Sequence, residues 1–364
     1  MPLENGIASP ATASRILAGI DEELFALEFM EWIGEILDIR GIHLAIDGKA
    51  LRAAMEKVKN FRSPMVMNAI DTATGLVIAQ LPIKNKDCEI TAIPELLKLL
   101  DIRGTTITTD AIGTQTEIMR QILEQDGHFV LIVKKNQPQS YEEIMRYFKE
   151  LAEDAEKMAK DPKAGPRYPE AMETYEEVFC QEKNRDRIEM RWYRTCKYPE
   201  LLTKTQKEWP FIQTVGQAKQ VRIPIEKDED GNDITPDMET FLKEGSRRRP
   251  RPTMGDSETS DLQETGLISD RSLAASEIGQ IKRDHWSVEN KVHHVLDDTF
   301  REDRSPAKKS KNNLALIRKF SYNILRIAML REKCAGVMTE MMDEFCDDHS
   351  LIEKYVLNGI ESFY

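Results

Sequence analysis

The order of strand-like and helix-like segments between residues 41 and 160 leaves few folds open to this chain. Three short apolar segments come first, and the second and third of them, 65–70 and 76–83, flank a turn sequence typical of a β-hairpin. Helix-like and strand-like segments then alternate up to a charged helix at 140–160. A hairpin followed by such alternation predicts an α/β fold in which helices pack on a mixed sheet.

The rest of the chain divides by its sequence pattern. The N-terminal residues have helical spacing. Residues 161–270 combine strand-like segments at 187–193 and 211–215 with long polar stretches rich in Gly, Pro and charge, such as the loop expected at 246–260, and a helix is expected to follow at about 273–296. We therefore expect five parts: a helical segment at 1–40, the first part of a core at 41–160, a β-rich insertion with a disordered polar loop at 161–270, the second part of the core at 271–333, and an acidic helical tail at 334–364.

The charge of the chain is unevenly distributed. A formal net charge of -12 argues by itself against nucleic-acid binding. However, residues 301–333 carry ten Lys or Arg against three acidic residues, whereas 340–364 carry seven acidic residues and one lysine. Five cysteines without a CxxC pair fit a reducing compartment, and no apolar run has the length of a membrane span. We expect a cytoplasmic protein with a locally basic surface.

Two aspartates each follow an apolar strand-like segment. Asp47 follows 42–46 and Asp110 follows 105–109, and α/β folds usually place their chemistry at such strand ends. Structural roles are also open, because Asp47 precedes a glycine and could begin a turn, while Asp110 could cap the helix that follows.

A third carboxylate lies between two histidines. In a helix, His285, Glu289 and His293 fall four residues apart along one face. Such a face is costly to bury unless a charged group lies opposite, so it indicates a metal or phosphate site. The alternatives are a solvated Glu289 and histidines that only pack between helices. We expect the neighbouring Trp286 to lie in the core.

Three carboxylates that converge need a counter-charge, because like charges raise one another's pKa. Divalent metal meets this need. Mg²⁺ prefers carboxylate and water oxygens, and two ions can clamp the attacking and leaving oxygens of a phosphodiester.

The segments around these carboxylates resemble the DDE transposases of bacterial insertion sequences, specifically the ISAs-type branch that includes the H-repeat-associated proteins. The resemblance covers about residues 8–332. It is carried by Ile-Asp-Gly-Lys at 46–49, Thr-Asp-Ala-Ile-Gly-Thr-Gln at 109–115, Lys-Lys-Asn-Gln at 134–137, His-Trp-Ser-Val-Glu-Asn-Lys-Val-His at 285–293, and the segments 296–297 and 300–303.

This resemblance implies a ribonuclease-H-like core, with a β-rich insertion before the last catalytic helix. It implies that Asp47, Asp110 and Glu289 are a metal-binding triad holding Mg²⁺ or Mn²⁺, with two ions expected. The implied activity is cleavage and strand transfer of double-stranded DNA by a homodimer. The family normally has a further helical region before the part that matches residue 1, so we expect a chain truncated relative to it. The stretch 220–270 is longer and more polar than is usual in the family.

Other residues are expected to support the triad or to contact DNA. His285, His293 and Asn290 could orient Glu289 or contact the scissile phosphate. Basic and amide side chains near the triad segments could contact the DNA backbone, although a solvated helix face or a turn would also explain them. These candidates are Lys134, Asn136, Gln137, Lys308, Lys309, Lys311, Arg318 and Lys319.

Two other functions remain open from the sequence. One is a hydrolase in which His285, Glu289 and His293 hold a transition metal such as zinc. The other is an inactive DNA-binding remnant of a transposase.

Overall fold

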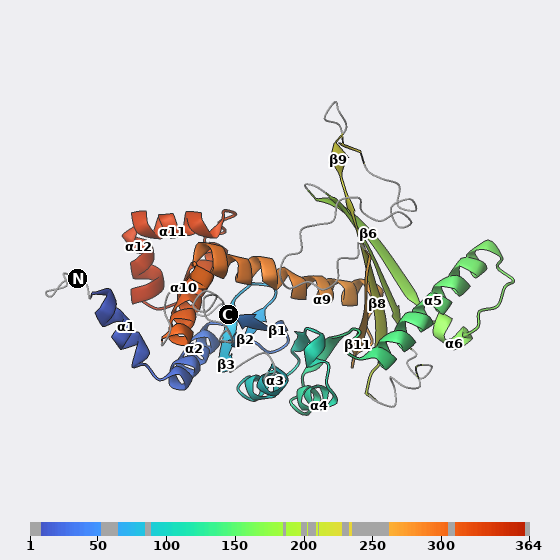
Figure 1. The fold of residues 1–364 in the computed structure, drawn as a ribbon, viewed down its shortest axis with the longest axis horizontal. Helices are drawn as coiled ribbons and strands as arrows, with labels where there is room; N and C mark the ends of the chain where they lie inside the picture. Colours follow the sequence, from blue (N-terminus) through green and yellow to red (C-terminus); the bar gives the residue numbers. More distant parts are fainter. Residues whose placement is uncertain are drawn as a thin grey trace, which may run out of the picture. The chain divides into compact units, whose positions relative to one another are not determined.

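The structure is a computed structural model, and it describes residues 9–51, 65–83, 89–184, 187–197, 202, 209, 211–227, 233–234, 262–304 and 310–360. The chain forms two compact units (Figure 1). The first consists of Met1–His128 and Arg283–Tyr364, and the second of Phe129–Lys282. Within the described residues, no helix is both long and apolar enough to cross a membrane.

The first unit contains a mixed sheet, which confirms the predicted fold class. Its strand order is β3-β2-β1-β4. Antiparallel pairs join β1 to β2 and β2 to β3, and a parallel pair joins β1 to β4. The strands are β1 (His43–Ala50), β2 (Met65–Asp71), β3 (Val77–Ile83) and β4 (Thr106–Thr109).

Helices cover both faces of this sheet, so every residue of the central β2 is buried. On one face, a Cβ atom added at Gly48 would lie 2.8 Å from the carboxylate of Glu89, at the start of helix α3 (Glu89–Lys98). On the opposite face, Gln80 of β3 accepts a hydrogen bond from Lys319 of α10 (Lys311–Arg331).

An aromatic cluster fixes α10 against the N-terminal helix α2 (Glu22–Ile36), which Asp21 caps by accepting two backbone N–H groups. Phe320 of α10 packs against three rings of α2, at centroid distances of 4.7–5.9 Å within the cluster. These rings belong to Phe25, Phe29 and Trp32. Asn323 of α10 also hydrogen-bonds both backbone groups of Val77, which ties the helix to β3.

The remaining elements of the first unit are helical. They are α1 (Pro10–Ala18), the 3-10 helix η2 (Ala111–Gly113), α4 (Thr116–Glu124), the π-helices η4 (Glu289–His293), η5 (Val295–Thr299) and η7 (Glu353–Leu357), the 3-10 helix η6 (Glu302–Arg304), α11 (Met338–Asp347) and α12 (His349–Ile352).

The second unit contains an antiparallel sheet, with the strand order β5-β11-β8-β7-β6. Its principal strands are β5 (His128–Val133, of which His128 is counted with the first unit), β6 (Glu176–Asn184), β7 (Arg187–Cys196), β8 (Thr214–Pro224) and β11 (Leu262–Ser269). In addition, β9 (Glu226–Lys227) pairs with β10 (Asp233–Ile234). Helix α5 (Pro138–Lys160) contacts β8 and β11, and the unit also holds α6 (Pro169–Met172).

Two sequence-based expectations about these strands need correction. The strand expected at 211–215 begins at Thr214 and continues to Pro224. The strand β6 was not anticipated, because it lies at the edge of the sheet and its side chains are only half-buried or exposed. Such a polar edge strand lacks the apolar alternation on which the prediction depended. The polar loop at 246–260 lies outside the described residues.

Candidate active site

Strand β1 places Asp47 inside the sheet and not at the end of a strand. The antiparallel pairing of β1 with β2 continues to Ala50, so the expectation that Asp47 ends its strand is wrong, and so is the alternative of a turn. The parallel pairing of β1 with β4, in contrast, ends at Ile46 opposite Thr109. Asp47 and Asp110 therefore directly follow the last paired residues, Ile46 and Thr109, of two neighbouring parallel strands.

Asp110 lies on the same face of the sheet as Asp47. Its backbone is extended, with φ -69° and ψ 177°, so the alternation of β4 continues through it. Its Oδ1 accepts a hydrogen bond from the backbone N–H of Ile112 at 3.0 Å, and it thereby caps η2. Gly113 permits this tight turn, because a Cβ atom there would lie 2.3 Å from Oγ1 of Thr109.

Glu289 and His293 approach Asp47 from the helical side. One potential ligand atom from each of the three residues lies within 4.8 Å of the other two. His293 is 3% exposed, and its Nε2 lies 3.1 Å from Oδ2 of Asp47. Burial raises the pKa of Asp47, but the contact with His293 and the charge of His285 outweigh it, so that the pKa lies below its ordinary value. Asp47 is thus held as a carboxylate.

The helix that carries these residues changes type at the site. Helix α9 (Ala275–Val288) is followed by the π-helices η4 and η5, in which His294 N–H bonds to Glu289 O and Phe300 N–H to Val295 O. The expectation of a regular helix over 273–296 is therefore wrong from Glu289 onward. Single π-helical turns occur frequently at functional sites.

His285 has a different neighbour from the one its spacing suggested. Its Nδ1 lies 2.9 Å from Oγ1 of Thr108, which also lies 2.9 Å from Nε2 of His43. His285 is therefore fixed against β4, and it does not belong to the ligand group of Asp47, Glu289 and His293.

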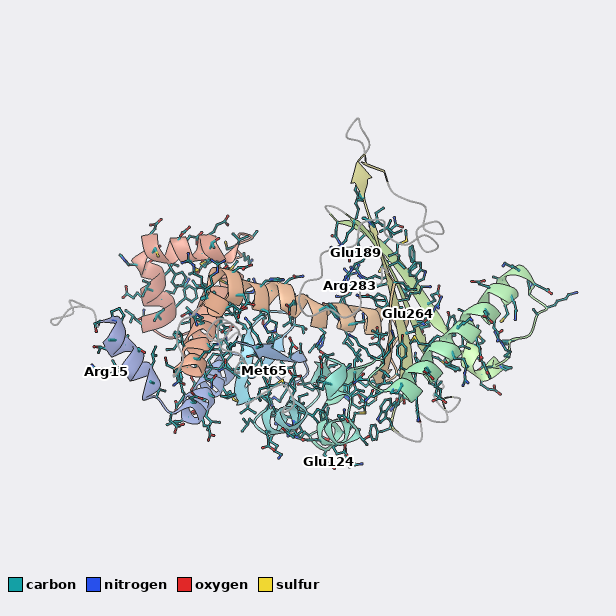
Figure 2. The ribbon with its side chains drawn as sticks, viewed as in Figure 1. Arg15, Met65, Glu124, Glu189, Glu264 and Arg283 are labelled. Atoms are coloured by element: carbon teal, nitrogen blue, oxygen red, sulfur yellow. The ribbon has the colours of Figure 1, made fainter. Side chains whose placement is uncertain are left out.

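Asn290 and Trp286, two other residues of this segment for which the sequence supplied an expectation, are both exposed. Trp286 is 48% exposed, so the expectation that it lies in the core is wrong. Helix α9 is divided between the two units, and Arg283, which is labelled in Figure 2, is its first residue in the first unit.

Asn68 is a candidate site residue that the sequence did not indicate. It lies directly opposite Asp47 in the β1–β2 register, which puts both side chains on one face. Asn68 is 1% exposed, and neither its amide nitrogen nor its amide oxygen has a hydrogen-bond partner among the described residues. A buried amide without partners is costly, so its position beside Asp47 indicates that a further polar group binds there.

These side chains fit a divalent cation. Two carboxylates and one imidazole nitrogen converge, Asp110 lies on the adjacent strand path, and the amide of Asn68 lacks a partner at the same place. Carboxylate oxygens suit Mg²⁺ and Mn²⁺, and an imidazole ligand is better suited to Mn²⁺ than to Mg²⁺.

Comparison with known proteins identifies the family. The family described as "Transposase DDE domain" matches residues 40–324, which is most of the chain. The chain belongs to the DDE transposase family. It is accordingly a transposase, an enzyme of DNA cleavage and strand transfer, and DDE transposases generally depend on divalent metal.

Individual relatives agree with this family and confirm the resemblance to H-repeat-associated proteins. The chain is 30% identical over 302 residues to the H repeat-associated putative transposase YhhI of Escherichia coli K12, covering 82% of this chain and 68% of that protein. It is also 30% identical over 301 residues to the putative protein YbfL of the same organism, with the same coverage of each chain. A solved piggyBac transposase synaptic complex with hairpin DNA aligns at a TM-score of 0.38 and 13% identity, over 84% of this chain and 51% of that one.

Two lysines that we expected to contact DNA are buried in this transposase. Lys319 is 0% exposed and its Nζ donates a hydrogen bond to Gln80 at 2.5 Å. Lys311 is 4% exposed and donates to the carbonyl of Leu51. The expectation fails for both, because α10 turns these ammonium groups toward the protein interior. Their position in the sequence, after the helical segment that carries Glu289, did not reveal which face of α10 they occupy.

Of the other residues of the first unit that we expected to contact DNA, only Arg318 lies among the described residues. Arg318 is half-buried, and its Nε donates to the carbonyl of Phe300 at 3.0 Å. Burial lowers its pKa, although the nearby Glu302 opposes this effect. Lys308 and Lys309 lie outside the described residues.

In the second unit, the predicted contacts lie in the turn between β5 and α5. Gln137 N–H bonds to the carbonyl of Lys134 at 2.9 Å, which closes the turn. Asn136 is exposed, whereas Lys134 and Gln137 are half-buried.

A basic cluster that the sequence did not indicate lies in the same unit. Burial, and then the positive charges of Lys134, Arg191 and Arg222, lower the pKa of Lys282 to about 8. Glu189, labelled in Figure 2 on β7, offsets part of this charge through its ion pair with Arg191. The four cations lie far apart in the sequence. The pairing of β7 with β8 brings Arg191 and Arg222 together, and α9 carries Lys282 close to them.

Proposed function

We propose that Asp47, Asp110 and Glu289 are the catalytic carboxylates of this transposase, and that they act with Mg²⁺ or Mn²⁺, two ions in all. The observation that supports this best is the convergence of Asp47, Glu289 and His293 within 4.8 Å, beside the strand path that carries Asp110. When bound, two divalent ions would stabilise the charge on the attacking and leaving oxygens of a phosphodiester. The carboxylates would bind the two ions and set the distance between them. Because water or a DNA hydroxyl is then the attacking group, no protein nucleophile is needed.

The neighbouring side chains are proposed to orient the carboxylates. His293 contacts Asp47 and is buried, so it fixes the carboxylate in one direction. His285, held by Thr108, anchors the end of α9 four residues before Glu289. Asn290, exposed next to Glu289, is available to DNA.

The proposed substrates are double-stranded element ends and target DNA, acted on by a homodimer at the nucleoid. A nicking assay with supercoiled plasmid and Mg²⁺ or Mn²⁺ tests this function. The hydrolase alternative is disfavoured, since His285 bonds to Thr108 and Asp47 takes its place beside Glu289 and His293. Absence of metal-dependent nicking by the purified chain would favour the inactive remnant.

Asn68→Ala is predicted to weaken metal binding. The amide of Asn68 lies beside Asp47 without a partner among the described residues, so it is placed to hydrogen-bond whatever polar group binds there. We expect the Kd for Mn²⁺, measured by electron paramagnetic resonance, to rise about tenfold. Asn313→Ala is the control, because Asn313 is equally buried but bonds the carbonyls of Leu17 and Ile20. Equal Mn²⁺ affinity in both variants would contradict the role of Asn68.

The double substitution Lys134→Ala and Arg222→Ala is predicted to weaken DNA binding. If both cations contact phosphates, affinity falls for all sequences and the slope of log K against log salt falls by about 2. Filter binding of an arbitrary duplex at several salt concentrations measures this. Lys219→Ala is the control, since Lys219 lies three residues from Arg222, on the other face of β8, over the ring of Trp192. An unchanged slope in the double variant would exclude the cluster as a DNA contact.

A further inference from the structure

We propose that Lys49 is a positioning residue that sets the π-helical segment carrying Glu289 and His293 against the strand carrying Asp47. This inference rests on the proposed function, because it assigns the residue through which that site keeps its geometry. Lys49 is not itself a metal ligand or a contact of DNA.

The strand fixes where Lys49 points. Side chains two residues apart share a face of a strand, so Lys49 and Asp47 both face the helical side of the sheet, about 7 Å apart along β1. Lys49 is 7% exposed, and it is therefore covered by the elements that lie over this face. Gly48 between them faces Glu89 and α3 on the opposite side.

Three groups from the helical side meet the Lys49 ammonium. Its Nζ lies 2.6 Å from Oδ1 of Asp297 in η5 and 2.6 Å from Oε2 of Glu302 in η6. It also donates to the backbone carbonyl of His293, at 3.4 Å. One side chain of β1 thus contacts the last residue of η4 and the two short helices that follow it.

Glu302 is itself fixed from a second direction. It is 1% exposed, and its Oε1 lies 3.8 Å from Nζ of Lys319, which hydrogen-bonds Gln80 of β3. The Lys49 contacts are therefore part of a buried chain of charges that begins on β1 and returns to β3 through α10. Such a chain restricts how far the helical segment can slide along the strand.

The π-helical turns make this restraint necessary. Glu289 is exposed and no hydrogen bond of its side chain holds it over Asp47 among the described contacts. Its position depends on the backbone of η4, whose C-terminal end Lys49 contacts through His293. Loss of this contact frees the segment on which both Glu289 and His293 depend.

The test is the Mn²⁺ affinity of the full chain without DNA, with Lys49→Met as the variant. Met keeps much of the length of the side chain but removes the ammonium group. We expect the Kd for Mn²⁺, corrected for the folded fraction by circular dichroism, to rise about tenfold or more. Asn313→Ala, which removes the partly buried hydrogen bonds to the carbonyls of Leu17 and Ile20, serves as the destabilised control with wild-type affinity.

The outcomes separate the inference from the proposed function. If folded Lys49→Met binds Mn²⁺ within about twofold of the wild type, Lys49 only neutralises buried acids and the inference is overturned. If Lys49→Met does not fold, Asp297→Asn replaces it, with an expected rise in Kd of about threefold and the same criterion for rejection. The proposed function is contradicted by a different pair of results. These are a wild-type protein that does not nick DNA and an Asp47→Asn variant that binds Mn²⁺ as tightly as the wild type.

Discussion

Asp47→Asn should abolish metal-dependent DNA nicking while leaving the fold intact. The substitution keeps the shape of the side chain but removes the negative charge that His293 contacts and that a divalent ion requires. Loss of several kcal/mol of charge stabilisation corresponds to a fall in rate of about a thousandfold or more, since about 1.4 kcal/mol is a factor of ten. The measurement is the initial rate of plasmid nicking with Mg²⁺ and with Mn²⁺. Asp110→Asn and Glu289→Gln are expected to behave alike.

Asp71→Asn is the matched control. Asp71 also lies in the sheet of the first unit, at the end of β2, but its carboxylate accepts hydrogen bonds from Ala73 and Thr74 in the hairpin turn. We expect this variant to lower stability and to keep the nicking rate of the folded protein. Loss of nicking only in Glu289→Gln, with Asp47→Asn active, would instead favour the histidine-based metal site.

Glu302→Gln should lower the free energy of unfolding by about 3–5 kcal/mol, the usual result of leaving a buried charge unpaired. Lys49 would keep its ion pair with the half-buried Asp297, whereas the buried Lys319 would have no carboxylate within ion-pair distance among the described residues. Burial raises the pKa of Glu302, but Lys319 and Lys49 lower it by more, so that its pKa lies below the ordinary value. Its contribution is therefore present above about pH 4.5 and is lost as the pH falls through its folded pKa.

Urea unfolding at pH 7, followed by tryptophan fluorescence, measures this effect. Asp303→Asn is the control, because the adjacent side chain is only half-buried, and we expect a change below about 1 kcal/mol. A loss of similar size in both variants would show that the buried network stabilises the unit no more than a surface ion pair does.

Short motifs were sufficient to single out the three carboxylates of the proposed site. Asp47, Asp110 and Glu289 each lie in a segment with a recognisable residue pattern, and the hairpin followed by helix–strand alternation predicted the mixed sheet. The local signal failed where the backbone departs from a regular element. The π-helical turns after Val288 were read as an ordinary helix, because the same residues have suitable spacing for both.

Residues without a local signal could not be found in this way. Asn68 became a candidate only through its register opposite Asp47, and the basic cluster around Lys282 only through the pairing of β7 with β8. Lys319 shows the reverse case. A run of basic residues looked like a DNA-binding face, yet the packing of α10 buries this lysine beside Gln80.

The amino-acid sequence alone indicated the family through its motifs and the mixed sheet through its periodicities of two to four residues, and it supplied the acidic residues of the proposed site. The tertiary structure decided which side chains meet: Asp47 with His293, Asn68 beside Asp47, and Lys49 with Glu302. The physical reason is that burial and charge pairing depend on strand register and helix rotation, which contacts between distant segments fix.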